Sequence, residues 1–115
     1  MCSSDLRHDN SQNELYRVNV TGTDNLLRAV HTLPVKSVIA VGSFEEYGDN
    51  PVPFREDMPA RPRSPYGATK AEATARVVAG GGTVVRFPVV YGPGQSATSF
   101  VGAACGAIQI GRAHV

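Results

Sequence analysis

The sequence has few of the features that mark membrane, secreted or nucleic-acid-binding proteins. Its 115 residues contain no apolar run long enough to span a bilayer. Two cysteines, Cys2 and Cys105, and three histidines are scattered, so neither a disulfide framework nor a metal site is predicted. A formal net charge of +1 gives no electrostatic reason to bind nucleic acid or acidic lipid. We therefore expect one small cytoplasmic domain with no signal peptide, no membrane partner and no nucleic-acid partner.

The two ends of the chain resemble one short oligonucleotide translated in opposite directions. One set of codons for residues 110–115 has a reverse complement that encodes Cys2-Ser3-Ser4-Asp5 after an initiating methionine. Sequencing adapters have this character, and added segments do not belong in an argument about the fold. We expect residues 1–6 and 110–115 to be foreign tails and residues 7–109 to be an internal piece of a longer protein. Chance similarity is the alternative.

The first half of the sequence predicts a helix followed by a strand. Residues 11–31 begin with the S-x-x-E spacing of a capping box and carry an uneven apolar stripe, which is typical of a helix. Residues 35–41 are short, β-branched and largely apolar, as in a buried strand of a parallel sheet, and Gly42 and Ser43 are predicted to close it. Residues 44–63 are rich in proline and glycine, which predicts a long loop that is functional or disordered.

The second half predicts another helix and strand. Ser-Pro at positions 64–65 provides an N-cap and a proline at the first helical position, and three consecutive glycines follow the apolar pattern. A helix is therefore predicted over residues 65–79. Residues 83–87 are predicted to be a second buried strand, and residues 96–109 to start a further helix. This order of elements is half of a doubly wound parallel α/β sheet, in which ligands bind beyond the carboxyl ends of the strands.

A phenol and an ammonium that can act together lie at the start of the second predicted helix. Tyr66 and Lys70 are four residues apart, so they lie on one helical face. A nearby ammonium favours the phenolate, and a phenol placed in this way can take a proton from a sugar hydroxyl or return it to a ketone. The bare Y-x-x-x-K pattern alone favours ordinary surface neighbours. However, Ser43 and residues 88–91 follow the two predicted strands, so all these residues fall on the ligand-binding edge of the sheet.

Four blocks of the sequence have the spacing of known motifs and cover nearly all of residues 14–109. They are N-x-x-G-T in residues 16–23, S-x-x-x-Y-G in 42–48, S-P-Y-x-x-x-K in 62–70 and R-x-x-x-x-Y-G-P-G-Q in 86–95. In this order they resemble the extended short-chain dehydrogenase/reductase family, especially its nucleotide-sugar epimerases, dehydratases and reductases. The resemblance implies a partial Rossmann-like sheet over residues 7–109, NAD or NADP as cofactor, a nucleotide-sugar substrate and a homodimeric parent protein.

The resemblance also implies a role for each matching residue. Tyr66 would be the general acid and base, Lys70 would hold the cofactor ribose and favour the phenolate, and Ser43 would hydrogen-bond the reacting sugar oxygen. Asn19 matches a helix asparagine that supports the lysine through a local kink, and an ordinary solvent-facing residue is an equal interpretation. The residues expected to contact the cofactor are Tyr66, Lys70, Val18, Asn19, Val41, Gly42 and Pro88.

Departures from the family pattern leave the exact reaction open. Phe44 stands where family dehydratases carry an acid or a hydroxyl, which removes a group that helps to expel water. Glu45, counted with the catalytic set, is expected either to abstract a proton next to a ketone or to be a loop carboxylate. The S-x-E-E-Y-G form also resembles reductases of 4-keto-6-deoxy sugars. Val89 replaces an asparagine that some family epimerases use on the nucleotide diphosphate.

The glycine-rich phosphate loop of the family is absent from the sequence, as is the residue that separates NAD from NADP. The sequence therefore predicts an NAD(P)-dependent oxidoreductase of the nucleotide-sugar epimerase/dehydratase type. A 4-keto-6-deoxy sugar reductase, a catalytically inert fragment and an NAD(P)-binding regulatory protein are the alternatives.

Overall fold

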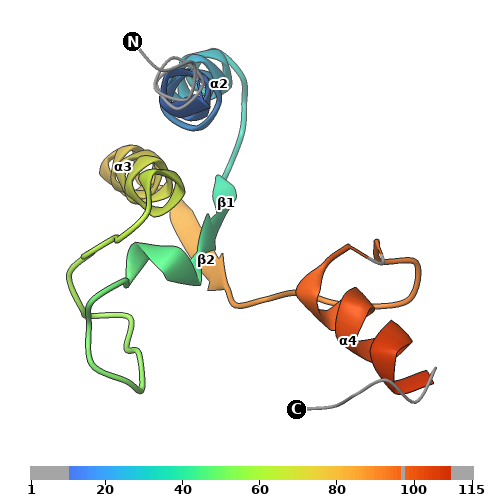
Figure 1. Ribbon diagram of the computed structural model, residues 1–115. Helices are drawn as coiled ribbons and strands as arrows, with labels where there is room; N and C mark the ends of the chain where they lie inside the picture. The colour runs from blue at the N-terminus through green and yellow to red at the C-terminus, as the bar shows by residue number, and fades with distance from the viewer. Residues whose placement is uncertain (1–10, 97, 110–115) are drawn as a thin grey trace, which may run out of the picture.

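A computed structural model describes residues 11–96 and 98–109 of the chain (Figure 1). Residues 11–16 are helical. The following elements are η1 (Arg17–Thr21), α2 (Gly22–His31), β1 (Ile39–Ser43), η2 (Phe44–Glu46), α3 (Pro65–Ala79), β2 (Thr83–Phe87) and α4 (Phe100–Gln109). The two tails predicted at residues 1–6 and 110–115 lie outside the described residues.

The helix predicted over residues 11–31 forms, but it contains an irregular turn. Its middle, η1, is π-helical, and Tyr16 and Gly22 on either side keep right-handed helical dihedral angles, so one helix continues through the turn. A π turn holds one more residue than an α turn, and such turns are frequent at functional sites. This explains the uneven apolar stripe, because half-buried Leu15 is followed by buried Val20 five residues later.

The two strands pair in parallel, as predicted. The register runs from Ile39 opposite Thr83 to Ser43 opposite Phe87. The bounds of β2 are those expected, whereas β1 forms but begins and ends later than the predicted residues 35–41. Residues 35–38 still turn from α2 towards the sheet, whereas Gly42 and Ser43 lie within β1 because they have strand partners in β2.

Helix α3 connects the strands and has the predicted ends. The side-chain oxygen of Ser64 accepts a hydrogen bond from the Gly67 amide at 2.9 Å, and Pro65 occupies the first helical position. Gly80 caps the other end, and Gly81 has a φ of 80°, a conformation that favours glycine. One face of α3 is buried against the strands and the first helix.

The long loop predicted between residues 44 and 63 begins with η2 and then folds back on itself. The Arg61 amide donates to the Glu46 carbonyl at 3.0 Å, and the Asp49 amide donates to the Arg61 carbonyl at 3.0 Å. The Asn50 side chain also donates to the carbonyls of Tyr47 and Pro59, at 2.6 and 2.7 Å. The two ends of the loop are therefore held together by hydrogen bonds.

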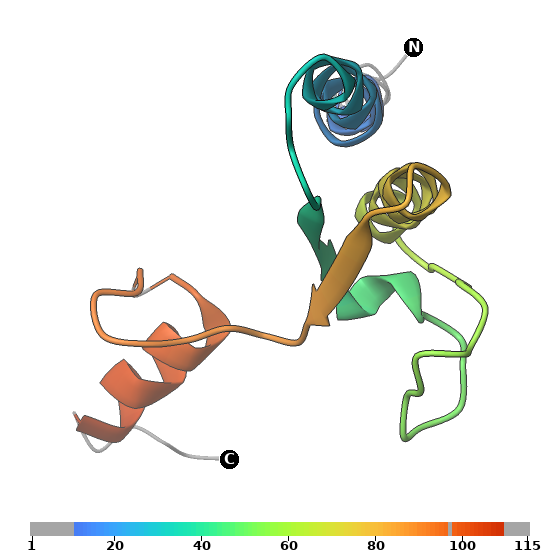
Figure 2. The ribbon, with the colours of Figure 1, turned by 180° about the vertical axis from the view of Figure 1, so that it is seen from behind.

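The strands are less covered than predicted. Helices α2 and α3 lie on one side of the sheet, and α4 lies away from it at the end of an extended segment (Figures 1 and 2). Ile39 and Val41 of β1 are 71% and 60% exposed. Because side chains alternate between the two faces of a strand, a strand with helices on only one side exposes every second residue. The expectation of strands buried on both faces is therefore wrong for the described part of the chain.

Candidate active site

The predicted site residues gather at the carboxyl edge of the sheet. Ser43 and Phe87 are the last residues of the two strands and lie opposite each other. Pro88, the next residue after Phe87, therefore lies at the same edge as Ser43. The start of α3 reaches the same edge, because the Ser64 hydroxyl donates to the Glu45 carboxylate at 2.6 Å. The turn after Ser43 and the first turn of α3 are thus held in contact.

Tyr66 and Lys70 project from the first two turns of α3. The phenol belongs to a residue that is 39% exposed, and its hydroxyl has no hydrogen-bond partner among the described residues. The Lys70 ammonium donates to the Val41 carbonyl at 2.7 Å, two residues before Ser43. An ammonium has further donors, so Lys70 is anchored to the strand while it can still bind a ligand.

Ser43 is held from two directions. Its side-chain oxygen accepts from the Glu45 amide at 3.2 Å, and its own amide donates to the Glu46 carboxylate at 2.8 Å. Together these bonds form a capping box at the start of η2. Glu46 is fully buried and also accepts from Arg86 Nε at 2.8 Å. The sequence analysis missed Glu46 and Arg86, although the S-x-x-E spacing of Ser43 and Glu46 is a signal for this box.

Asn19 lies in the π turn and faces α3 rather than solvent. Its side-chain amide donates to the Thr69 hydroxyl oxygen at 2.9 Å, and the Thr69 hydroxyl donates to the Tyr66 carbonyl at 3.0 Å. Thr69 was not predicted as a site residue, but it links the irregular turn to the turn that carries Tyr66. Val18 lies in the same π turn with 57% of its surface exposed.

Phe44 and Glu45, the two residues after Ser43, are both packed against other parts of the chain. The Glu45 carboxylate is half-buried and accepts the Ser64 hydrogen bond, so it links η2 to α3. Phe44, which is 37% exposed, lines a small cavity of about 150 Å³ together with Phe54. The contact with Ser64 is compatible with the interpretation of Glu45 as a loop carboxylate, and its expected role as a base stays a prediction.

Groups that can bind a polar ligand lie along this edge. They are the exposed Tyr66 phenol and the Lys70 ammonium, and the exposed Val41 lies beside them. The structure gives Gly42 a packing role in addition to its predicted contact with the cofactor, because a Cβ there would lie 2.6 Å from a Glu46 carboxylate oxygen. This glycine makes room for Glu46. The described residues contain no group of acidic, histidine and cysteine side chains that could hold a metal ion, and no helix among them is long and apolar enough to cross a membrane.

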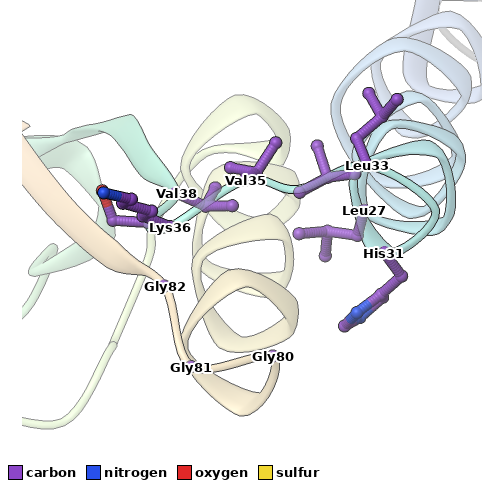
Figure 3. A pocket seen from close by; sticks show the side chains of 11 residues that line it. Leu27, His31, Leu33, Val35, Lys36, Val38, Gly80, Gly81 and Gly82 are labelled. Carbon is purple, nitrogen blue, oxygen red and sulfur yellow. The ribbon is translucent and has the colours of Figure 1, made fainter.

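A separate cavity of about 230 Å³ lies at the other edge of the sheet (Figure 3). Its lining includes Leu27 of α2, Val38 just before β1, and the glycine turn before β2. These segments precede the amino ends of both strands, opposite the edge that carries Ser43. The cavity is therefore not part of the candidate active site.

Comparison with known proteins decides the family. The family profile described as the NAD dependent epimerase/dehydratase family matches residues 2–114. The chain belongs to the NAD-dependent epimerase/dehydratase family. The predicted relationship to extended short-chain dehydrogenases/reductases is thereby confirmed, and the expectation of NAD or NADP as cofactor agrees with the dependence for which the family is named.

Curated relatives in this family carry several activities. The chain is 34% identical over 109 residues to the dTDP-6-deoxy-L-talose 4-dehydrogenase (NAD(P)(+)) of Kitasatospora kifunensis, covering 87% of this chain and 34% of that protein. It is 37% identical over 90 residues to the human dTDP-D-glucose 4,6-dehydratase, covering 71% of this chain and 25% of that protein. The names of both relatives specify a dTDP-linked sugar but differ in the reaction.

A solved structure supports the predicted fold class. The dTDP-glucose 4,6-dehydratase of Bacillus anthracis, solved in complex with NAD, matches with a TM-score of 0.70 and 29% identity, covering 84% of this chain and 34% of that one. The Rossmann-like parallel α/β prediction is therefore confirmed. The chain spans about a third or less of the length of these relatives.

Proposed function

We propose that this chain forms part of an NAD(P)-dependent oxidoreductase of the epimerase/dehydratase type, which acts on a hydroxyl or keto group of a nucleotide sugar. The observation that carries the proposal is the carboxyl edge of the sheet, where the Lys70 ammonium binds the strand two residues before Ser43 and Tyr66 presents an open phenol. The names of the relatives support a nucleotide sugar as the substrate.

The proposed chemistry assigns each residue one task. When bound, the oxidised cofactor would supply the hydride acceptor for the sugar carbon. Tyr66, as the phenolate, takes the proton of the sugar hydroxyl, and Ser43 donates a hydrogen bond to the same oxygen. Lys70 would hold the ribose hydroxyls and supply a positive charge on the helical face that carries the phenol. In the reverse direction Tyr66 returns the proton to the oxygen, and hydride delivery to the opposite face of the sugar would give epimerisation.

Replacing the phenol tests this proposal. In the whole protein that contains this chain, Tyr66→Phe is expected to lower kcat by about 10²- to 10⁴-fold because the proton acceptor is lost, while the Kd for NAD(H) stays within a small factor. Turnover is measured by separating the product sugar from the substrate by chromatography for a panel of nucleotide sugars, and absorbance of the reduced nicotinamide reports any net change of the cofactor. Tyr16→Phe is the matched control, because the Tyr16 hydroxyl donates to Glu72 on the helix surface. Full turnover in the Tyr66 variant would rule out its acid–base role.

A second candidate is a reductase of 4-keto-6-deoxy nucleotide sugars. It is favoured because Phe44 provides no acid and the Glu45 carboxylate is already bonded to Ser64, so both groups are poorly suited to expel water. The dehydrogenase relative from Kitasatospora kifunensis, whose name specifies a 6-deoxy sugar, supports the same candidate. The substrate panel separates the two, since a reductase consumes reduced cofactor with a keto sugar, whereas a dehydratase or epimerase shows no net cofactor change.

A further inference from the structure

We propose that Glu46, through its ion pair with Arg86, is a positioning residue for Ser43. This inference rests on the proposed function, in which the Ser43 hydroxyl contacts the reacting oxygen. Neither residue belongs to the group that touches substrate or cofactor in that mechanism. What points to Glu46 is a fully buried carboxylate three residues after Ser43 whose two oxygens are both used.

The two Glu46 oxygens join the two strands at their carboxyl ends. One oxygen accepts from the Ser43 amide and the other from Arg86 Nε, each at 2.8 Å. Arg86 lies opposite Gly42 in the strand register, and its guanidinium carbon lies 4.7 Å from the centre of the Tyr47 ring. Burial lowers the pKa of Arg86, but its contacts with Tyr47 and Glu46 outweigh that effect, so the pKa lies above its ordinary value. The cation is therefore permanent.

Stability alone does not explain this buried pair. A buried ion pair is often no more stabilising than a well-packed apolar pair of similar volume, because both charges lose their hydration. What charged hydrogen bonds add is direction. Here the bonds fix the backbone of Ser43 relative to β2, and the absence of a side chain at Gly42 leaves the space that the carboxylate fills.

Fixing the backbone also orients the Ser43 hydroxyl. The capping box makes the Glu45 amide a donor to the Ser43 side-chain oxygen, at 3.2 Å. A serine hydroxyl has one donor and two acceptor sites. With one acceptor site occupied by that amide, the hydroxyl proton remains available to a ligand oxygen at the sheet edge. Glu46 therefore positions a hydrogen-bond donor rather than taking part in the chemistry.

The test separates the fold from the position of Ser43 with three variants of the whole protein. Glu46→Leu leaves the half-buried Arg86 guanidinium without its ion-pair partner, which should lower both Tm and kcat. Adding Arg86→Met replaces the pair by apolar side chains and should restore most of the Tm. If Glu46 positions Ser43, kcat in this double variant stays lower by about 10²-fold, with the Kd for NAD(H) unchanged. Glu46→Gln keeps an acceptor for the Ser43 amide and should retain more activity than the double variant.

A control variant, an NMR measurement and a Ser43 variant complete the test. Glu14→Gln is the matched control, because Glu14 forms an exposed ion pair with Arg17, and it should change neither Tm nor kcat. The Ser43 amide resonance in NMR spectra should shift and exchange faster in the double variant. If the double variant regains both Tm and kcat, the inference is wrong and the pair is only structural. If Ser43→Ala keeps full turnover, the proposed function is wrong rather than the positioning role. An unchanged Ser43 amide resonance in the double variant would show that Glu46 does not position Ser43, whatever the kcat.

Discussion

Thr69 connects the two helices that border the candidate active site. Its hydroxyl oxygen accepts from the Asn19 side chain in the π turn and its proton goes to the Tyr66 carbonyl. The residue is only 9% exposed, so water cannot readily replace these partners. The Thr69 hydroxyl therefore links the π turn to the turn of α3 that carries Tyr66.

Removing the Thr69 hydroxyl should destabilise the fold more than removing an exposed hydroxyl. Thr69→Val keeps the shape of the side chain but leaves the Asn19 amide without its partner, and we expect it to lower the free energy of unfolding by about 1–3 kcal/mol. Urea unfolding of the whole protein measures the change. Thr69→Ser keeps both bonds and should lose less. Thr32→Val removes an exposed hydroxyl bond and should be nearly neutral; equal losses at the two positions would contradict the assigned role.

Site residues could be predicted from the sequence only where their relation is local. The spacing of Tyr66 and Lys70 within one helix is enough to place them together. The bonds of Thr69 with Asn19 and of Arg86 with Glu46 join residues 50 and 40 positions apart. No local pattern specifies such partners, because they depend on how the helices and strands pack. The Ser43 capping box is an intermediate case, since its S-x-x-E spacing was present in the sequence and was not used.

At the scale of elements, the start of α3 contributes both to the helix and to the site. The Ser64 side chain accepts from the Gly67 amide and donates to the Glu45 carboxylate. We expect Ser64→Ala to lower the free energy of unfolding by about 1–2 kcal/mol, because an N-cap and a link to η2 are lost together. Differential scanning calorimetry of the whole protein measures the effect.

Helix α4 supplies the control for this prediction. The Ser99 hydroxyl accepts from the Gly102 amide at 3.1 Å in the same capping geometry, but α4 lies away from the sheet (Figure 2). Ser99→Ala should therefore leave the main unfolding transition unchanged. A similar loss for both variants would show that the link between α3 and η2 adds nothing to the cap.

The elements themselves were largely predictable, and the errors have physical causes. The ends of α3 are specified by Ser-Pro and by glycine, whose backbone preferences act locally. The start of β1 was predicted too early because Val35 and Val38 are β-branched residues typical of strands, yet the backbone there is still turning: the Val35 amide donates to the Leu33 carbonyl at 2.7 Å. The family resemblance implied a local kink at Asn19, but the π turn itself was not predicted, because an uneven apolar stripe does not specify which type of helical turn causes it.

At the scale of the whole molecule, the chain is more open than its length suggests. The radius of gyration is 17.8 Å, against about 13 Å for a compact domain of this size. Strand coverage could not be predicted, because an apolar strand has the same sequence whether or not a neighbour covers it. The buried apolar residues of the described part are Val20, Tyr47, Ala73 and Val77, which is a small core.

This openness predicts the behaviour of the 115-residue chain on its own. We expect a broad, weakly cooperative thermal transition, because little apolar surface is buried. Adding NAD or NADP should not raise the Tm, since a ligand stabilises only a state that binds it. Circular dichroism melts with and without cofactor measure both effects. A sharp transition that moves upward with cofactor concentration would show that the isolated chain already holds a complete binding site.

The loop after η2 has a consequence for how members of this family can diverge. Its ends are joined by the backbone hydrogen bonds of Arg61 with Glu46 and Asp49, so residues 51–60 form an excursion beyond a closed base. The entropic cost of lengthening such an excursion rises only slowly. Insertions, deletions or exchanges there can reshape the surface around the excursion without changing the separation of Ser43 and Tyr66. This segment can therefore diverge in length and sequence independently of the edge of the sheet that carries those two residues.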